Sequence, residues 1–202
     1  MGKVELNKKQ KKTTLLQTAF ELFTEKGFTK TTISDIVNRA GLAKGTFYLY
    51  FKDKYDLRDR LVTHKTGQLF SDAHMELMKN PVEGFENQLL FVVDHIIGQL
   101  EKDHGLLQFI SKNLSWGIFK NAFEKKVPEE SRLFYEYYQE LMIQNQIQCD
   151  NPEIMLFTII ELVGSTCYSC ILFEQPTSMD TYLPYLHKSI RQIVTAFTHT
   201  PE

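Results

Sequence analysis

The chain has 202 residues, of which 43% are hydrophobic and 24% are charged. This length suits one large domain or two small ones, and this hydrophobic content is ample for a packed core. Residues 1–60 contain 13 Lys+Arg and 7 Asp+Glu, whereas residues 61–202 contain 10 and 18. The basic first part predicts contact with nucleic acid, and the acidic remainder is excluded as a DNA-binding surface. Three cysteines and no secretory leader predict a protein of the reducing cytoplasm.

The chain begins with a polar segment in which five lysines precede the first apolar repeat: Lys3, Lys8, Lys9, Lys11 and Lys12. Such a charge run is typical of a solvated, frayed terminus, and the alternative is an arm that neutralises phosphates beside a DNA-binding helix. The first helix is expected from about Lys11 to Lys26, with a broad apolar stripe, and Gly27 should end it.

Residues 32–54 are predicted to form two short helices around a tight turn. Thr32 can cap the first helix, and Gly41 should end it because glycine adopts the left-handed conformation that helix ends favour. Phe47 and Phe51 lie one turn apart on the second helix and can pack inward. A helix, a short turn with glycine and a second helix with hydrogen-bond donors on its outer face form the helix-turn-helix pattern for the DNA major groove.

Helical periodicity continues through the rest of the chain. Further helices are expected from Lys54 to about Asn80 and from Val82 to about Lys102, and one or two shorter helices are expected within Gly105–Phe123. After a loop at Lys125–Pro128, three more helices are expected: from Glu129 to Gln148, from Asn151-Pro152 onward and from about Met179 to Thr198. No strand alternation interrupts this pattern, so the chain is predicted to be all-α.

The apolar run at residues 154–173 is long enough for a membrane span, which is the alternative interpretation of this helix. Its single ionisable residue, Glu161, lies near mid-run, where a charge is costly in lipid, and Lys or Arg anchors are absent at both ends. We therefore expect a helix that is buried on all sides in a soluble protein.

The stretch from Thr31 to Lys54 resembles the DNA-binding domain of the tetracycline-repressor-like (TetR) family of bacterial regulators. The matching positions are Ala19, Phe20, Leu22, Phe23, Gly27, Thr32, Ile36, Ala40, Gly41, Lys44, Gly45, Phe47, Tyr48, Tyr50, Phe51, Lys54 and Leu57. The family usually has Ser where this chain has Ala43, so a side-chain cap on the second helix is missing.

The resemblance implies a three-helix DNA-binding domain at residues 1–54 and an α-helical ligand-binding and dimerisation domain at residues 55–202. A homodimer would place two reading helices one DNA turn apart on a palindromic operator. In this family a small molecule bound among the central helices releases the DNA, and the last two long helices pair with their copies. Dimer residues are therefore expected at Gly164, Ser165, Ser169, Leu183, Leu186, Ile190 and Val194.

The residues expected to contact DNA come from the two helices of the motif and the start of the next: Thr32, Ser34, Lys44, Gly45, Thr46, Tyr48, Leu49, Tyr50 and Lys54. Lys54 resembles the lysine with which the family contacts a phosphate. No Arg, Asn or Gln occurs from Lys44 to Tyr50, and these are the side chains that make bidentate contacts to guanine or adenine. We therefore expect the second helix of the motif to recognise its operator through thymine contacts, groove shape and phosphate contacts.

The ligand pocket is expected among aromatic and apolar side chains of the second domain, with one acid among them. The candidates are Phe85, Phe109, Trp116, Phe119, Tyr135, Tyr138, Met142, Phe157, Glu161 and Tyr168. Aromatic residues at helical spacing are also typical of plain core. Glu161 has two interpretations: it faces the pocket and meets a cationic ligand, or it pairs with His187, Lys188 or Arg191 at the dimer interface.

Other chemistry finds little support in the sequence. Cys167 and Cys170 have the spacing of a redox or zinc pair, but they stand alone in an apolar helix and are expected to be core fillers. The six histidines form no close metal-ligand cluster, and no nucleotide-binding loop or nucleophile elbow is present. Neither an enzyme nor a cofactor is therefore expected. The predicted function is a ligand-responsive repressor, and the alternative is an all-α ligand- or protein-binding module whose DNA binding is secondary.

Overall fold

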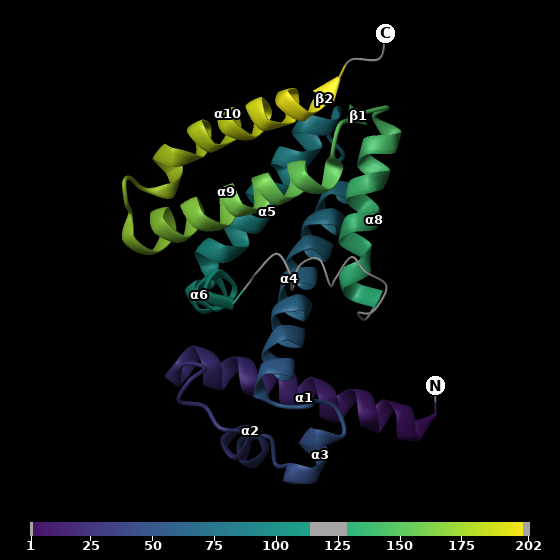
Figure 1. The fold of residues 1–202 in the computed structure, drawn as a ribbon, viewed down its shortest axis with the longest axis vertical. Coiled ribbons are helices and arrows are strands. Elements are labelled where there is room, and N and C mark those ends of the chain that lie inside the picture. The colour runs from purple at the N-terminus through teal and green to yellow at the C-terminus, as the bar shows by residue number, and fades with distance from the viewer. Residues whose placement is uncertain (1, 114–128, 200–202) are drawn as a thin grey trace. The chain divides into compact units, whose positions relative to one another are not determined.

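The computed structural model describes residues 2–113 and 129–199, and at residues 3 and 129–135 it describes the backbone alone. The chain folds into two compact units, Met1–His64 and Lys65–Glu202, here called unit 1 and unit 2 (Figure 1). The division falls inside helix α4 (Lys54–Lys79), whereas the sequence placed it at the start of this helix.

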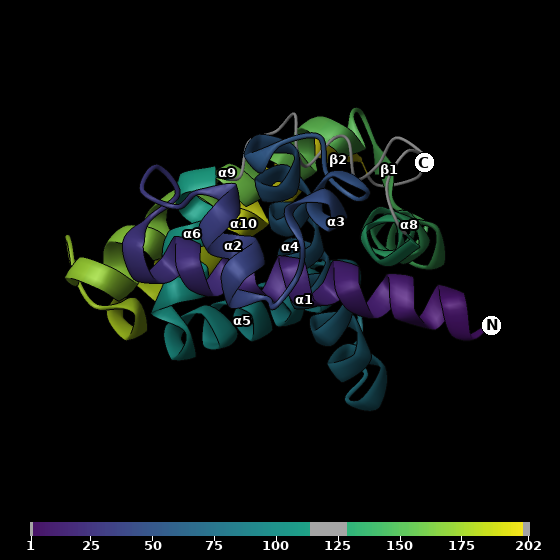
Figure 2. The ribbon, with the colours of Figure 1, turned by 90° about the horizontal axis from the view of Figure 1, so that it is seen from below.

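Unit 1 is built from α1 (Lys3–Lys26), α2 (Ile33–Arg39), α3 (Lys44–Tyr48) and the first turns of α4. Helix α1 packs against α2, and α2 packs against α3; Figure 2 shows these helices from below. The polar segment that the sequence left outside the first helix belongs to α1, and its Lys8 and Lys9 are exposed. At the other end, Gly27 follows α1 with a φ of 84°, a conformation that glycine adopts without strain.

The core of unit 1 forms where the apolar stripes of these helices meet. The side chains with 0–1% exposure include Leu15, Ala19, Ile36, Phe47, Phe51, Leu57, Leu61 and Val62. Phe47 and Phe51 pack inward, as their spacing predicted, with ring centroids 5.5 Å apart. Burial of each such ring contributes about 1.5–3 kcal/mol, which holds the short α3 on the other helices.

Unit 2 contains the rest of α4 and the helices α5 (Phe85–Lys102), α6 (His104–Asn113), α8 (Glu129–Gln144), α9 (Pro152–Phe173) and α10 (Met179–Phe197). Helix α5 begins later than predicted because Gly84, with a φ of 83°, interrupts the helical backbone before it. Helix α8 ends four residues before the predicted Gln148, and Gln146 beyond it has a φ of 54°. The predicted loop at Lys125–Pro128 and the part of Gly105–Phe123 beyond α6 lie outside the described residues.

Two short strands, β1 (Gln148–Cys149) and β2 (Thr198–His199), form an antiparallel pair that the sequence did not predict. Strands of two residues are too short to show alternation of apolar and polar side chains. His199 Nε2 lies 2.7 Å from Asp150 Oδ1, and the backbone N–H of Asp150 donates to the carbonyl of Phe197. The pair therefore joins the segment before α9 to the end of α10.

Helix α9 packs along α10 and also contacts α5 and α6 (Figure 1). Met155, Ile159 and Cys167 are buried on this side, whereas Glu161 and Ser165 are exposed on the other. The prediction of a helix buried on all sides is therefore wrong for the chain by itself, because the described part of unit 2 supplies neighbours for one face only. Within the described residues, α9 is the one helix whose length and composition would allow a membrane span.

Candidate DNA-binding surface and ligand cavity

The N-terminus of α2 is held by a reciprocal cap between Thr32 and Asp35. Thr32 Oγ1 accepts a hydrogen bond from the Asp35 backbone N–H (3.1 Å), and Asp35 Oδ2 accepts one from the Thr32 N–H (2.8 Å). Lys26 Nζ of α1 donates to the same Oδ2 at 2.8 Å. These bonds, with that of Lys26 the largest cause, lower the pKa of Asp35 to about 2. Thr32 and Ser34 are both exposed at this end of α2, where a DNA phosphate can approach the helix N-terminus.

A glycine forms the turn between α2 and α3. Gly41 has a φ of 65°, in the left-handed region that costs other residues roughly 1–2 kcal/mol. The Leu42 N–H donates to the carbonyl of Val37 at 2.9 Å and closes the end of α2. The predicted end of the first motif helix at Gly41 is confirmed.

Helix α3 turns one face to the core and the other to the surface. Of the predicted DNA contacts on and after it, Lys44, Gly45, Tyr48 and Leu49 are exposed, and Thr46 and Tyr50 are half-buried. Tyr48 is 53% exposed and Leu49 is 79% exposed, which leaves apolar surface suited to contact with thymine methyl groups. Ala43 precedes the helix without a side-chain cap, as expected.

Lys54 binds backbone carbonyl groups within unit 1. Its Nζ donates to the carbonyl oxygens of Phe28 (2.9 Å), Thr31 (2.8 Å) and Thr29 (3.5 Å). Because an ammonium group has three N–H donors, these carbonyls use all of them. In this structure Lys54 holds the segment between α1 and α2 against the first turn of α4, which makes it a positioning residue for the motif. The predicted phosphate contact of Lys54 stays a prediction.

A second ion pair between α1 and α2 was not found by sequence reasoning. The Arg39 guanidinium donates to both carboxylate oxygens of Glu25, at 2.6 and 2.8 Å. This bidentate bond holds the pKa of Glu25 below its ordinary value. Partners on different helices leave no periodic pattern, so the sequence carried no signal for the pairing.

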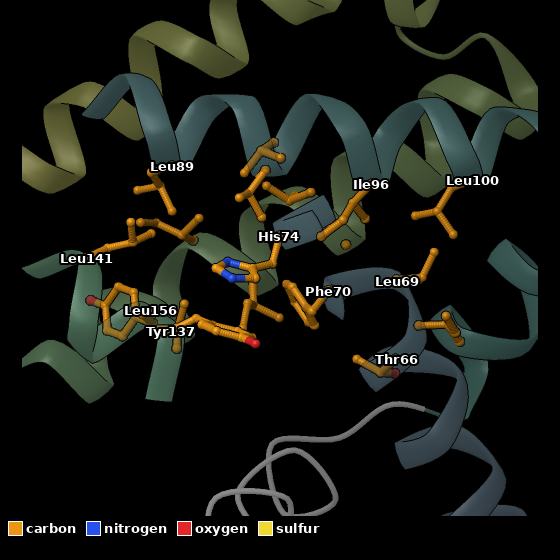
Figure 3. A pocket seen from close by; sticks show the side chains of 18 residues that line it. Thr66, Leu69, Phe70, His74, Leu89, Ile96, Leu100, Tyr137, Leu141 and Leu156 are labelled. Carbon is orange, nitrogen blue, oxygen red and sulfur yellow. The ribbon is translucent and has the colours of Figure 1, made fainter. Parts of the chain in front are cut away.

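Unit 2 contains a cavity of about 120 Å³ lined by residues of α4, α5, α6, α8 and α9. Aliphatic and aromatic side chains make up most of its wall, and Figure 3 shows them converging from these helices. The side chains with polar atoms in the wall are Thr66, His74, Tyr137 and Tyr138.

These polar groups differ in how they are satisfied. Tyr138 Oη donates to the carbonyl of Pro152 at 3.0 Å. His74 stacks on Tyr137 with ring centroids 3.4 Å apart, and burial lowers the pKa of His74, so its imidazole is neutral at pH 7. Thr66 is 7% exposed, and within the described part of the chain its Oγ1 has no hydrogen-bond partner.

The structure places few of the predicted pocket residues at this cavity. Tyr138 lines it, whereas Phe85, Phe109, Met142, Phe157, Glu161 and Tyr168 are not among its lining residues. The first three of these are buried core, Phe157 and Tyr168 are half-buried, and Glu161 is exposed. Trp116, Phe119 and the side chain of Tyr135 lie outside the described residues. Sequence reasoning missed Thr66 and His74, whose spacing along α4 puts them on one helical face with Phe70.

The structure places some of the predicted dimer residues in the core and others at the surface. Leu186, Ile190 and Val194 are 0–2% exposed and belong to the core of unit 2, so they are corrected from interface to core. Gly164 and Ser165 are exposed, and Ser169 and Leu183 are half-buried. The sequence did not single out Ile154, Phe173 and Tyr185, which are 49%, 56% and 66% exposed.

Two of the three partners suggested for Glu161 are engaged elsewhere. His187 Nε2 lies 2.6 Å from Asp94 Oδ1, and Arg191 donates to Glu86 at 2.7 Å; both pairs join α10 to α5. The third suggested partner, Lys188, is exposed on α10. Within the chain, Glu161 is therefore not a lining residue of the cavity, and His187 and Arg191 are paired with other acids.

The cysteines of α9 are free thiols in the core. Cys167 and Cys170 are 0% and 1% exposed, and burial raises the pKa of Cys167 to about 12. A thiol with such a pKa stays protonated and is a poor nucleophile or metal ligand. Among the described residues no group of three or more His, Cys, Asp or Glu side chains could hold a metal ion.

Comparison with known proteins supports the helix-turn-helix assignment. The sequence model of the family described as "Bacterial regulatory proteins, tetR family" matches residues 15–61. The uncharacterized HTH-type transcriptional regulator YvdT of Bacillus subtilis (strain 168) is 29% identical over 181 residues, which cover 83% of this chain and 87% of YvdT. The fatty acid metabolism regulator protein of the same organism is 34% identical over 99 residues, 49% of this chain and 50% of that protein.

The fold of the whole chain also has a counterpart among solved structures. The transcriptional regulator FadR from Bacillus subtilis, solved in complex with stearoyl-CoA, matches with a TM-score of 0.58 and 20% identity over 93% of this chain and 99% of FadR. The segment matched by the family, residues 15–61, contains the capped α2, the turn at Gly41 and the exposed face of α3. Residues 15–61 therefore form a helix-turn-helix domain that matches the tetR family of bacterial regulatory proteins, and the chain is similar to helix-turn-helix transcriptional regulators along most of its length.

Proposed function

We propose that the chain represses transcription as a homodimer bound to a palindromic operator, and that a small, mainly apolar molecule in the cavity of unit 2 releases it. The observation that carries this proposal is the cavity itself, because α4 forms part of its wall and also begins at Lys54, which holds the helix-turn-helix. A ligand that displaces the α4 wall would act on a helix that contributes to both units.

The exposed side chains of α3 support DNA contact as a main function. Lys44, Tyr48 and Leu49 are exposed together, with Thr32 and Ser34 at the start of α2. A cation and two large apolar side chains on one short helix suit a groove with a phosphate wall and thymine methyl groups. The alternative, a ligand- or protein-binding module with secondary DNA binding, gives no physical reason for these groups to be exposed together.

The exposed face of α9 and α10 supports a homodimer. Ile154 and Phe173 of α9 and Tyr185 of α10 leave large apolar side chains in solvent. Exposed apolar surface of this kind marks interaction sites. Gly164 and Ser165 lie exposed on α9 and are small enough for a helix of a second copy to approach closely.

Glu161 would be covered by this dimer and therefore needs a partner in it. An acid in an otherwise apolar interface is stable only when it is paired. Because His187 and Arg191 are held by α5, the cation left for it is Lys188 of the partner subunit. Pairing of Glu161 with that lysine would also fix the register of the two copies.

The relatives indicate which ligands should be tried first. One is named as a regulator of fatty acid metabolism, and the solved FadR structure contains stearoyl-CoA. A cavity with a mainly apolar wall suits hydrocarbon. Acyl-CoA thioesters of increasing chain length and small neutral aromatic compounds therefore make up the first set.

Fluorescence anisotropy with a labelled duplex from the chain's own upstream region tests the proposal. Nanomolar, salt-dependent binding is expected from the wild type, and an effective ligand should lower the anisotropy. Val92→Phe is the informative variant because Val92 lines the cavity and the larger ring fills it. It should bind the duplex normally and lose the response to ligand.

Val82→Phe provides the matched control, since Val82 is half-buried before α5 and is not a lining residue. It should bind DNA and respond as the wild type does. Release of the Val92→Phe variant by the same ligand at the same concentration would show that the cavity is not the effector site. Failure of the wild type to bind any duplex of its own upstream region would contradict the repressor assignment.

A further inference from the structure

Thr66 carries an unusual hydroxyl in the cavity wall. It is 7% exposed, its Oγ1 is buried, and no described residue forms a hydrogen bond with it. Threonines in helices commonly donate to the carbonyl four residues before, and Thr63 of the same helix donates to Asp59 at 2.9 Å. A buried polar group without a partner costs free energy, and native proteins retain few of them. Thr66 therefore lines a ligand-sized space and carries a hydroxyl that no described residue satisfies.

The other described lining residues provide no charge to balance an ion. None of the described lining residues is Asp, Glu, Lys or Arg. His74, which lies near the middle of the group in Figure 3, stacks on Tyr137, and burial lowers its pKa so that it is uncharged at pH 7. A charged group buried here would lose its hydration without gaining a counter-ion.

The volume of the cavity limits the size of its occupant. Its about 120 Å³ is slightly less than the engineered apolar cavity of about 150 Å³ that holds benzene in another protein. One ring with a short substituent fits such a space, whereas an eighteen-carbon acyl chain does not without displacement of the wall.

We infer that the effector of this chain is a compact, uncharged, mainly apolar molecule with one hydrogen-bond acceptor, which takes the hydrogen of the Thr66 hydroxyl. This inference rests on the proposed effector role of the cavity. It adds the chemical class of the ligand and the side chain that selects it.

Calorimetric titration of the full-length protein with three probes of similar size tests the inference. Ethylbenzene has no acceptor, acetophenone has a neutral carbonyl, and benzoate has a charged carboxylate. Thr66→Val removes the hydroxyl and keeps the shape, so it should lower the affinity for acetophenone about tenfold relative to ethylbenzene. Thr66→Ser keeps a hydroxyl and should retain the wild-type preference, and benzoate should bind more weakly than acetophenone.

The ligand-free protein gives a second readout. Because Thr66→Val removes a buried donor that has no partner among the described residues, it should raise the Tm by about 2–4 °C. A lower Tm for this variant would show that the hydroxyl is satisfied in solution and would overturn the inference.

The measured affinities can also contradict the inference. These outcomes can be distinguished from a failure of the proposed function. An unchanged ratio of acetophenone to ethylbenzene affinity in Thr66→Val, equal binding of benzoate, or no binding of any probe to the wild type would each contradict the inference. If long acyl-CoA thioesters then release DNA in the anisotropy assay, the proposed function is retained and only the inferred ligand class is wrong. Conversely, Thr66-dependent binding of acetophenone without release of DNA would support the ligand class and contradict the effector role.

Discussion

Lys54 and Phe28 are joined twice, by a hydrogen bond of 2.9 Å from the Lys54 Nζ to the Phe28 carbonyl and by the same Nζ lying 4.3 Å from the centroid of the Phe28 ring. The ring also packs edge-to-face against Tyr55, with centroids 5.2 Å apart. The segment between α1 and α2 is thereby fixed to the start of α4. Since α2 follows this segment directly, the lysine controls where the helix-turn-helix sits on its unit.

Replacement of Lys54 by methionine tests this positioning role. Lys54→Met keeps the apolar stem and removes the ammonium, so the Phe28 and Thr31 carbonyls lose a charged donor, at a cost of about 2 kcal/mol. Hydrogen exchange at the amides of α2 should accelerate accordingly. DNA affinity should fall while the slope of its salt dependence stays unchanged, because no phosphate contact is lost.

Lys44→Met is the matched control, with the same substitution on the exposed side of α3. It should leave the exchange of α2 amides unchanged and reduce the salt slope of DNA binding by about one unit. If Lys54→Met instead reduced the slope and left exchange unaltered, Lys54 would be the phosphate contact that the family resemblance implied.

The operator should be recognised without bidentate side chains. No Arg, Asn or Gln occurs from Lys44 to Tyr50, and Tyr48 and Leu49 are the most exposed apolar groups of the motif. Replacing each operator thymine by uracil should therefore weaken binding at one or more positions, by about 1 kcal/mol at each contacted methyl. Loss confined to one or two guanines, with no effect of uracil, would contradict this mode of recognition.

Acid should weaken unit 1 through Asp35. Its folded-state pKa of about 2 lies below the ordinary value of 3.8, so its contribution is fully present above pH 3.8 and is lost as the pH falls toward 2. Asp35→Asn keeps an acceptor for the Thr32 N–H and removes the charge that pairs with Lys26. Thermal unfolding between pH 4 and pH 2 should therefore depend less on pH in this variant. Parallel curves for the two proteins would mean that the carboxylate is not stabilised in the folded state.

Charge reversal tests the proposed dimer contact. Glu161→Lys should weaken dimerisation about tenfold or more, because in the proposed dimer it would face Lys188 of the partner subunit with a like charge. Lys188→Glu should do the same, and the double variant should regain wild-type dimerisation in sedimentation equilibrium. Lys79→Glu, at the exposed end of α4, is the control and should dimerise normally. Additive losses in the double variant would exclude the pairing.

Much of the local structure could be predicted because it depends on neighbours in the chain. The Thr32 cap, the end of α2 before Gly41 and the inward packing of Phe47 and Phe51 each require residues no more than one helical turn apart. The bounds of α4 and α10 also follow from apolar periodicity, and Pro81 explains the end of α4. Such features depend on backbone geometry that is the same in every helix.

The apolar stripe of Leu186, Ile190 and Val194 shows the limit of prediction from helical periodicity. Its period predicted a buried face, and the face is buried, but against the core of its own unit and not against a second copy. Periodicity shows that a face is covered and carries no information about what covers it. The same limit explains why α9 was expected to be buried on every side.

The sequence by itself determined the helices, the helix-turn-helix and the family, because caps, glycine turns and apolar stripes act within a few residues. Only the tertiary structure decided that Lys54 binds carbonyls 23 to 26 residues away, that Glu161 is exposed and that Thr66 reaches a cavity with its donor unused. These properties depend on which helices meet and on the space left between them. Side chains distant in the sequence share no period, so their contacts appear only once the chain has folded.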